Sequence, residues 1–223
     1  AVGEVVCGAP CVLAGLEVAV ETFSQLDPAV HVSRLRRDGD QCAAGDEVLR
    51  VAGLGTALLT AERTALNFLQ RMSGVATLTH RCVAVVKGRT IVLDTRKTIP
   101  TLRVLDKYAV RAGGGVNHRM ALDDAILIKD NHIALAGSIS EAMARVRRAG
   151  HTGLVTVEVQ SLSDVAKAIE SGADVLLADN MSLAEIEETI RLTRGVAKVE
   201  VSGGLTVDRL KEVAITGPEY VSI

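Results

Sequence analysis

The sequence has few aromatic residues: no tryptophan, two tyrosines and two phenylalanines among 223 residues. Sites that stack nucleic-acid bases or cage quaternary ammonium groups need aromatic rings, so this shortage argues against both. The net charge of −2 comes from 25 basic and 27 acidic residues, which gives no global positive field to attract nucleic acid. We therefore expect no nucleic-acid partner, and any cationic site must be a local cluster.

Long apolar segments are also missing. No apolar run reaches the roughly 18 residues of a membrane-spanning helix, and the opening residues AVGEVVCGAP lack the basic start and apolar stretch of a secretory signal. The four cysteines form no CxxC pair and adjoin no histidine cluster of the kind that binds zinc, so we expect buried, reduced thiols. These absences predict a globular protein with no membrane partner and a cytoplasmic location.

A repeat of about 22 residues begins near residue 125. Each cycle contains an apolar stretch, a polar loop, a helix-capping residue, an amphipathic helix and a glycine. Serine or threonine marks each expected helix start, at Ser138, Ser161, Ser182 and Thr206. Acidic residues follow the first three starts as in a capping box, at Glu141, Asp164 and Glu185, and glycines follow the helices, at Gly150, Gly172, Gly195 and Gly217. Each cycle is therefore one β/α unit.

The apolar stretches of the repeat predict parallel strands that are buried on both faces. They are residues 125–128, 155–159, 174–178, 198–201 and 220–223, and residues 90–93 add a sixth after a helix over about 61–86. Strands that alternate with helices predict an α/β fold. Both a barrel and an open doubly wound sheet fit this pattern, and we favour an incomplete, open α/β barrel of about six parallel strands.

Residues 1–64 follow a different pattern. Short valine-rich segments alternate with turns at 38–39 and 53–55, and residues 15–23 (GLEVAVETF) predict one helix. We expect a separate, smaller α/β domain over residues 1–64 and a barrel domain over residues 65–223.

Polar residues follow the C-terminal ends of the expected strands, where α/β-barrel enzymes carry their active sites. They are Asp94, Arg96, Lys97, Lys129, Asp130, His132, Glu158, Asp179, Asn180, Glu200 and Ser202, and the long connection after the first strand adds His118 and Arg119. Two cations about 6 Å apart at an effective dielectric near 20 repel by roughly 3 kcal/mol. A pocket that gathers arginines and lysines therefore predicts an anionic ligand.

The types of residue in this set indicate which anion it would bind. Arginine presents a planar fork to a carboxylate or a phosphate. Glu158 and Asp179 supply the opposite charge, which suits a metal-bound phosphate, sugar hydroxyls or a developing positive charge. The turn at residues 202–204 can present backbone N–H groups to a phosphate. Structural alternatives remain open: Glu158 could be an inward carboxylate paired with a lysine, and Lys129 could be an ion-pair partner or a Schiff-base nucleophile.

Six segments form a more specific pattern: TAERTALNFLQRMSG (60–74), DTRKTIPTLRVLDKYAVRAGGGVNHR (94–119), ILIKDNH (126–132), VEV (157–159), LADN (177–180) and VEVSGGLT (199–206). Together they resemble the quinolinate phosphoribosyltransferase family, in order and over essentially the whole chain. DTRKT followed by GGGVNHR and IKDNH is the most specific part. The family's architecture, an incomplete α/β barrel joined to an α/β sandwich, is similar to the fold expected above.

The resemblance implies transfer of a phosphoribosyl group from phosphoribosyl pyrophosphate to quinolinate with decarboxylation. The products are nicotinate mononucleotide, pyrophosphate and carbon dioxide, and Mg²⁺ is the implied cofactor. The implied ligands of the two quinolinate carboxylates are Arg63, Arg96, His118, Arg119 and Lys129. The residues implied for phosphoribosyl pyrophosphate and for catalysis are Lys97, Glu158 and Asp179, with Ser202, Gly203 and Gly204 near its phosphate.

Two further features follow from the resemblance. Pyrophosphate would hold most of the Mg²⁺, with Glu158 or Asp179 as a possible protein ligand. The family works as a homodimer, and the arginine matching Arg63 reaches into the neighbouring subunit's site.

The chain also departs from the family pattern. It opens after the family's first helical segment and ends before its last phosphate loop, LADN replaces the usual LLDN, and Gln160 follows VEV. Two other functions stay open: a Schiff-base lyase that uses Lys129, and a non-catalytic relative that binds an anion. The intact set of cations argues against the second.

Overall fold

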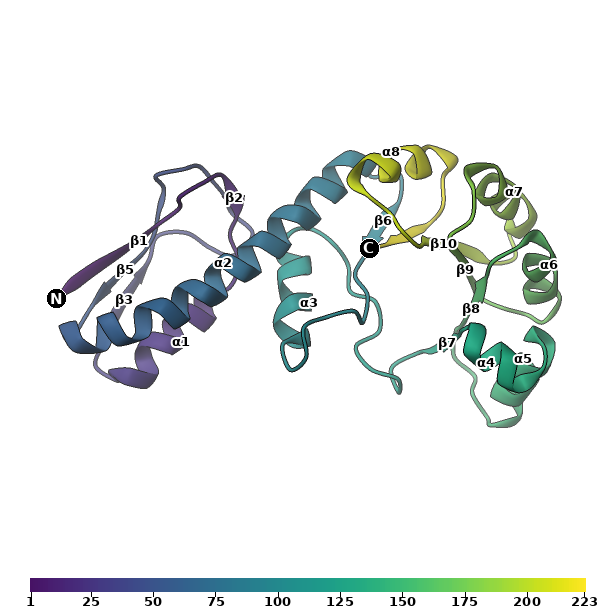
Figure 1. Cartoon of the computed structure of the whole chain (residues 1–223), viewed down its shortest axis with the longest axis horizontal. Helices are drawn as coiled ribbons and strands as arrows, with labels where there is room; N and C mark the ends of the chain where they lie inside the picture. Colours follow the sequence, from purple (N-terminus) through teal and green to yellow (C-terminus); the bar gives the residue numbers. More distant parts are fainter. The chain divides into compact units, whose positions relative to one another are not determined.

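The structure, a computed structural model, describes all residues from 1 to 223 and divides into two compact units. Unit 1 comprises Ala1–Arg81 and Thr98–Val116, and unit 2 comprises Cys82–Lys97 and Asn117–Ile223 (Figure 1). None of the helices combines the length and the apolar character that a membrane crossing requires. The domain boundary expected near residue 64 stays a prediction; residue 64 lies within helix α2 (Gly55–Val86).

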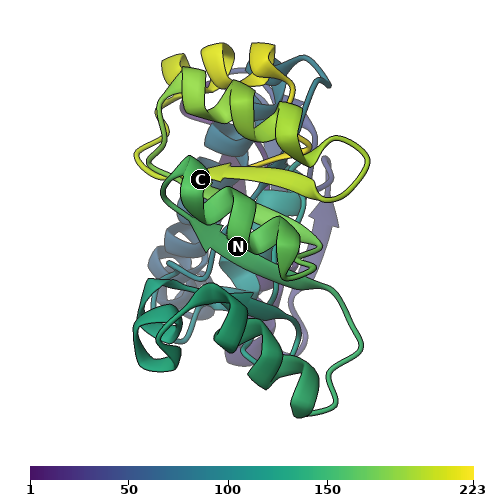
Figure 2. The ribbon, with the colours of Figure 1, turned by 90° about the vertical axis from the view of Figure 1, so that its right-hand side faces the viewer.

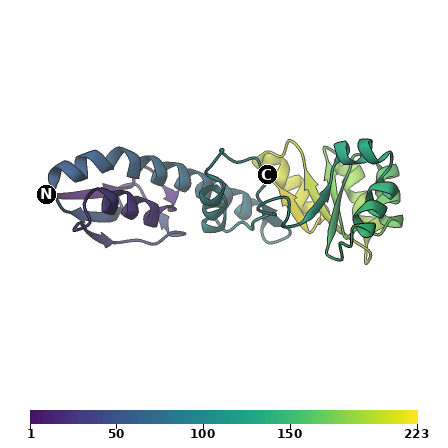
Figure 3. The ribbon, with the colours of Figure 1, turned by 90° about the horizontal axis from the view of Figure 1, so that it is seen from below.

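Unit 1 is built on a three-stranded antiparallel sheet in the order β1 (Val2–Val6), β5 (Glu47–Ala52), β3 (His31–Arg34). Two short strands, β2 (Cys11–Val12) and β4 (Gln41–Cys42), form a separate pair. Helix α1 (Leu16–Leu26) and the first part of α2 pack on the larger sheet, and Figure 3 shows α2 lying along these strands. Their shared core contains Leu16, Ala19, Phe23, Val48, Leu49, Val51, Ala61, Ala65 and Leu69.

The cysteines are all free, and only two of the four, Cys42 and Cys82, are buried as expected. Cys7 and Cys11 are partly exposed, with their sulfur atoms 3.8 Å apart. Burial, followed by the neighbouring thiols, raises the pKa of Cys7 to about 12. Because the thiolate is the reactive form, this group is a poor nucleophile.

Helix α3 (Arg103–Ala112) also belongs to unit 1, and the sequence pattern did not predict it. Its buried face includes two charged residues, Asp106 and Lys107. Arg71 of α2 donates to both carboxylate oxygens of Asp106, at 2.8 and 3.0 Å. Gly113, just after α3, packs so closely that an added Cβ would lie 2.3 Å from the carbonyl oxygen of Ala76. Segment 98–116 is thus an integral part of unit 1.

Unit 2 contains a six-stranded sheet in which every pair of neighbours is parallel. Its order is β6 (Ile91–Leu93), β11 (Tyr220–Ser222), β10 (Lys198–Ser202), β9 (Val175–Asp179), β8 (Val155–Val159), β7 (Ile126–Ile128). The six predicted strands agree with these bounds to within one residue at each end. The sheet curves and stays open between its edge strands β6 and β7 (Figure 1), so the predicted α/β class with an open barrel is confirmed.

Helices cover the outer side of this sheet, as Figure 2 shows. They are α4 (Asp130–Ala136), α5 (Ile139–Arg148), α6 (Leu162–Glu170), α7 (Leu183–Thr193) and α8 (Val207–Thr216). The four predicted helix starts are confirmed, because each predicted serine or threonine side chain accepts a backbone N–H three residues on. The four glycines after these helices have φ between 76° and 88°, which explains why glycine is there.

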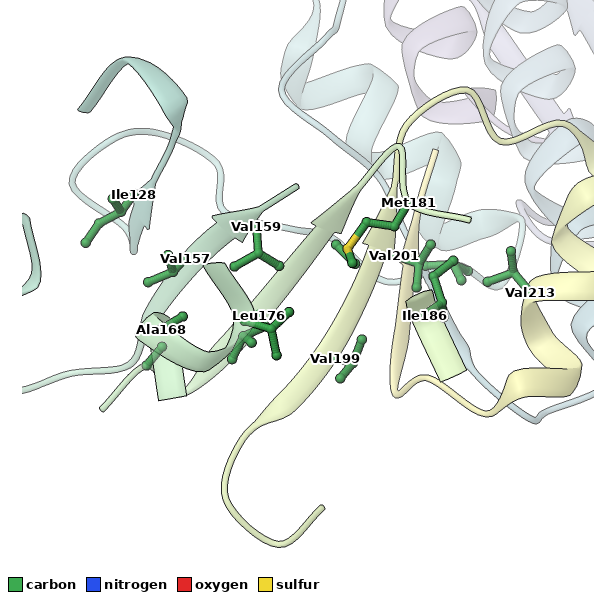
Figure 4. Packing of buried hydrophobic residues seen from close by; sticks show 14 of the residues in the cluster. Ile128, Val157, Val159, Ala168, Leu176, Met181, Ile186, Val199, Val201 and Val213 are labelled. Atoms are coloured by element: carbon green, nitrogen blue, oxygen red, sulfur yellow. The ribbon is translucent and has the colours of Figure 1, made fainter. Parts of the chain in front are cut away.

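Alternation along the strands separates the core from the opposite face of the sheet. Val157 and Val159, Leu176 and Ala178, and Val199 and Val201 pack against the helices together with Ile186 and Val213 (Figure 4). Residues between them in the sequence, such as Glu158, Leu177 and Glu200, therefore point to the inner face of the barrel.

Candidate functional site

The inner face of unit 2 brings the strand-end carboxylates into one region. Leu177 of β9 pairs in register with Glu158 of β8 on one side and with Glu200 of β10 on the other. Glu158 and Glu200 therefore flank Leu177 in one row across the sheet. Asp179 and Ser202 pair with each other two residues further along, at the C-terminal ends of β9 and β10.

Lys129 and Glu158 form the shortest ion pair of this face. The Lys129 Nζ lies 2.6 Å from Glu158 Oε2, and the Glu158 side chain is only 6% exposed while that of Lys129 is 46% exposed. Lys129 immediately precedes α4, where the His132 Nδ1 accepts the backbone N–H of Lys129 at 2.9 Å. The ion pair that we considered as a structural alternative for Glu158 is thus present, with the ammonium group at the edge of solvent.

Asp94, which directly follows β6, holds the loop that carries His118. Its buried carboxylate accepts the backbone N–H of His118 at 2.9 Å and a side-chain N–H of Asn117. The Nδ1 of His118 in turn accepts the backbone N–H of Arg119 at 2.8 Å. The ring proton must therefore be on Nε2, which lies 3.6 Å from Glu200 Oε2.

Arg119 lies next to another cation. Its Nη1 donates to the carbonyl oxygen of Ala125 at 3.1 Å, which fixes the guanidinium group beside the start of β7. Burial, followed by the positive charge of Arg96, lowers the pKa of Arg119. An anion placed at these two arginines would relieve their repulsion and offset the solvation that Arg119 loses on burial, so this pair is a candidate anion-binding site of unit 2.

The loops after β9 and β10 fit together closely. Asn180 adopts a left-handed conformation, with φ 56°, and its backbone N–H donates to the carbonyl oxygen of Ser202 at 3.1 Å. Its side-chain Nδ2 donates to Asp179 Oδ2 at 2.9 Å, which orients that carboxylate. Gly203 has φ 94°, and an added Cβ there would lie 2.4 Å from Asn180 Oδ1. Gly204 follows with φ 56° just before helix α8, so a turn with two left-handed glycines faces the Asp179 loop.

The remaining predicted site residues are exposed. Lys97 follows β6 in unit 2, and its backbone N–H donates to Thr95 Oγ1 at 3.0 Å. Arg63 lies on α2 in unit 1 with its side chain exposed, whereas all the other predicted site residues belong to unit 2.

One acidic residue was left out of the predicted binding set. Glu200 is 2% exposed, and its Oε1 has no hydrogen-bond partner. The signal for it was present in the sequence, because Glu158 and Glu200 both occupy the middle of a VEV triplet in a parallel strand. The same triplet in two strands with matched register places both carboxylates on the inner face.

Similar sequences all point to one family. The sequence model described as the quinolinate phosphoribosyl transferase N-terminal domain matches residues 1–73, and that of the C-terminal domain matches residues 75–223. The chain is 42% identical over 222 residues to the probable nicotinate-nucleotide pyrophosphorylase (carboxylating) of Bacillus subtilis (strain 168), covering 99% of this chain and 77% of that protein. It is 38% identical over 227 residues to the nicotinate-nucleotide pyrophosphorylase (carboxylating) of Mycobacterium leprae, covering 99% and 80%.

Solved structures agree with the sequence relatives. The crystal structure of NadC from Streptococcus pyogenes superposes with a TM-score of 0.95 at 42% identity, covering 100% of this chain and 79% of that chain. The nicotinate-nucleotide pyrophosphorylase from Francisella tularensis gives a TM-score of 0.96 at 38% identity, covering 100% and 80%. With both domains matched by sequence and the fold matched by structure, the chain belongs to the quinolinate phosphoribosyltransferase family.

Proposed function

We propose that this protein makes nicotinate mononucleotide, pyrophosphate and carbon dioxide from quinolinate and phosphoribosyl pyrophosphate, a step in NAD biosynthesis. The relatives named nicotinate-nucleotide pyrophosphorylase (carboxylating) carry the name of the reverse direction of this reaction. The observation that carries the proposal is the presence of a half-buried arginine, Arg119, and its cationic neighbour Arg96 in the same unit as the carboxylates of the strand ends, on this family's fold. Such a site suits one anionic substrate beside one phosphorylated sugar.

The dicarboxylate is the ligand that we assign to the cations. Arg96 and Arg119 would each present a guanidinium fork to a quinolinate carboxylate, and Lys129 would add an ammonium group from the edge of the Glu158 ion pair. His118 would contact the same ligand, since the Arg119 backbone binds its ring. The partner subunit's Arg63 would complete the set.

Phosphoribosyl pyrophosphate is the ligand that we assign to the carboxylate side of the face. Lys97 would bind its phosphates, and the turn at Ser202, Gly203 and Gly204 would approach its 5′-phosphate with backbone N–H groups. Glu158 and Asp179 would face the ribose. As pyrophosphate leaves, positive charge develops at the ribose C1, and these two carboxylates would stabilise it.

The pyridine nitrogen then forms the bond to C1 and becomes cationic. The C–C bond to the adjacent carboxylate breaks, carbon dioxide leaves, and the electron pair remains on the ring carbon beside the cationic nitrogen. A proton then adds to this electron pair and forms the C–H bond of the product. The positive nitrogen stabilises that carbanion without any group of the protein. The residues of the site would mainly hold the two reactants in line and neutralise their charge.

Mg²⁺ is the cofactor that we propose. No three His, Cys, Asp or Glu side chains form a metal site by themselves, which fits a metal that is held by one carboxylate and the phosphates of the substrate. Glu158 already accepts a hydrogen bond from the Lys129 ammonium group, whereas Asp179 accepts one only from the Asn180 amide. Asp179 is therefore the better protein ligand. When bound, Mg²⁺ would neutralise the pyrophosphate and make it a better leaving group.

We also propose a homodimer in which Arg63 contributes to the partner subunit's site, and a cytoplasmic location without a nucleic-acid or membrane partner. Exposure of Arg63 on α2 supports the first, since the side chain is available to a second copy. The four free cysteines and the balanced charge support the location and the absence of a nucleic-acid partner.

A steady-state assay tests the reaction. With quinolinate, phosphoribosyl pyrophosphate and Mg²⁺, the protein should release carbon dioxide and pyrophosphate in equal amounts, and chelation of the metal should abolish both. Release of neither product would contradict the proposal. Trapping of a substrate on Lys129 by borohydride would favour a Schiff-base lyase instead, although the salt bridge to Glu158 occupies that ammonium group.

A further inference from the structure

Glu200 is a buried carboxylate whose hydrogen-bonding capacity is only partly used. Its side chain is 3% exposed, and its Oε1 has no hydrogen-bond partner. Its chain neighbours Val199 and Val201 pack on the helix side, so Glu200 points to the inner face, between Leu177 and Tyr220 of the adjacent strands. A buried carboxylate oxygen without a hydrogen-bond partner destabilises the folded protein. Such groups are retained where they contribute to a binding or catalytic site.

His118 is the only basic group that forms an ion-pair contact with Glu200, and the ring of His118 is already held on its other side. Its backbone N–H donates to Asp94, and its Nδ1 accepts the N–H of Arg119. Its Nε2 faces Glu200 Oε2 at 3.6 Å. The imidazole thus lies between a carboxylate on the sheet and the backbone of Arg119.

The pair formed by Glu158 and Lys129 offers a comparison on the same face. There the contact is 2.6 Å, a full charge-assisted hydrogen bond. At 3.6 Å the contact between Glu200 and His118 is longer than a hydrogen bond. Hydrogen bonds in active sites are often long without substrate and shorten in the complex.

We propose that Glu200 is a positioning residue of the quinolinate site. Its carboxylate draws the Nε2–H of His118 into a hydrogen bond, and the ring in turn fixes the backbone of Arg119. Glu200 acts through His118 and does not touch the substrate, because a carboxylate beside the quinolinate dianion would repel it. The inference rests on the proposed function, since it takes Arg119, whose backbone N–H the ring of His118 accepts, as a quinolinate ligand.

Two substitutions of Glu200 test whether its side chain acts by accepting a hydrogen bond or only by filling space. Glu200→Ala removes the acceptor and should weaken quinolinate binding about tenfold or more, the effect of losing one hydrogen bond to a charged group, with phosphoribosyl pyrophosphate binding unchanged. Glu200→Gln keeps an acceptor oxygen of the same reach and should restore quinolinate affinity to within about threefold of the unsubstituted protein. Both dissociation constants are measured by calorimetry, with thermal unfolding as the check on folding. Equal quinolinate affinity in Glu200→Ala and the unsubstituted protein, or equal loss in both variants, would overturn the proposal.

Comparison of the double variant with the single His118 variant gives a second test. If Glu200 acts through the ring, quinolinate binding by His118→Ala/Glu200→Ala should be no weaker than by His118→Ala alone. Additive losses would mean that Glu200 acts independently and would overturn the positioning role.

A co-structure with quinolinate tests the proposal without any substitution, and so covers the case in which Glu200→Ala does not fold. The distance between Nε2 and Oε2 should fall to about 3.2 Å or less in the complex. If His118 Nε2 and Glu200 Oε2 stay beyond hydrogen-bond distance with quinolinate bound, only the role of Glu200 is refuted. Failure of the unsubstituted protein to bind quinolinate at all would refute the proposed function.

Discussion

Arg96 and Arg119 are neighbouring cations: burial of Arg119, followed by the charge of Arg96, lowers the pKa of Arg119. Substitution of either residue by alanine should weaken quinolinate binding by about 2 kcal/mol or more, since each loses charge-assisted hydrogen bonds to a carboxylate. Calorimetric titration with quinolinate measures the loss. Arg191→Ala is the control. Arg191 pairs with Glu188 on the exposed side of α7, so this variant should bind quinolinate normally. Unchanged binding in both site variants would remove the arginines from the site.

Gly203 and Gly204 form a matched pair for a second prediction. A Cβ on Gly203 would lie 2.7 Å from the backbone nitrogen of Asn180, whereas the nearest contact for Gly204 is 3.9 Å. Gly203→Ala should therefore displace the two loops and weaken phosphoribosyl pyrophosphate binding strongly, while Gly204→Ala should cost only about 1 kcal/mol of stability from its left-handed backbone. Binding titrations and thermal unfolding of both variants check this. Equal effects of the two substitutions would contradict it.

At the scale of residues, the sequence predicted which side chains share a face better than what each one contacts. The sequence left open an inward Glu158 paired with a lysine of unknown position, and the structure pairs it with Lys129. The role of Asp94 could not be predicted in this way, because its partners Asn117 and His118 lie at the far end of a connection that leaves the sheet. The contact of Glu200 with His118 could not be predicted for a similar reason, since it depends on how that connection returns.

Helix α7 illustrates how local signals fix an element. Ser182 accepts the backbone N–H of Glu185, and the Glu185 carboxylate accepts the backbone N–H and the hydroxyl of Ser182. Ser182→Ala should destabilise the protein by about 1 kcal/mol, because the cap and its return bond are both lost. Ser182→Asp retains an acceptor and should stay close to the unsubstituted protein. Chemical denaturation measures the difference, and equal stability of all three proteins would show that packing alone holds α7.

The other two expected capping boxes are incomplete, each for a different reason. At the start of α5, Glu141 binds Arg145 and Arg148 instead of returning to the backbone of Ser138. At the start of α6, Asp164 is shorter and reaches only the hydroxyl of Ser161. The serine caps are confirmed at both helices, but the return bond is missing at α5 because two arginines compete for Glu141 and at α6 because the side chain of Asp164 is short.

Two helices were not predicted, and each lacks the usual pattern. Helix α3 buries Asp106 and Lys107, so charged residues occupy positions where an apolar stripe would mark a packed face. Helix α4 has no buried residue, and His132 takes the place of the usual acidic residue near its start. Periodicity detects helices that pack through apolar side chains, as α5 to α8 do, and fails where polar contacts replace them.

At the scale of the whole molecule, the proposed homodimer makes a complementation prediction. Arg63→Ala and Lys129→Ala proteins should each be nearly inactive, and a mixture that exchanges subunits should regain about a quarter of the normal activity per subunit, because half of the dimers are hybrids with one intact site. Steady-state assays after dissociation and reassociation measure this. A mixture of Arg96→Ala and Lys129→Ala is the control: both substitutions are on the same side of the proposed shared site, so no intact site can form. Recovery in neither mixture would contradict the shared site.

The order of the strands has a consequence for synthesis on the ribosome. Strand β6 pairs only with β11, which is made well over 100 residues later, so its hydrogen bonds wait until the rest of unit 2 has emerged. Unit 1 is also incomplete until Val116 has been made, because segment 98–116 belongs to it. A nascent chain that ends between these points exposes an unpaired apolar strand, and long-range parallel pairing of this kind is slow and prone to aggregation. During synthesis β6 therefore stays without its partner strand until β11 has been made.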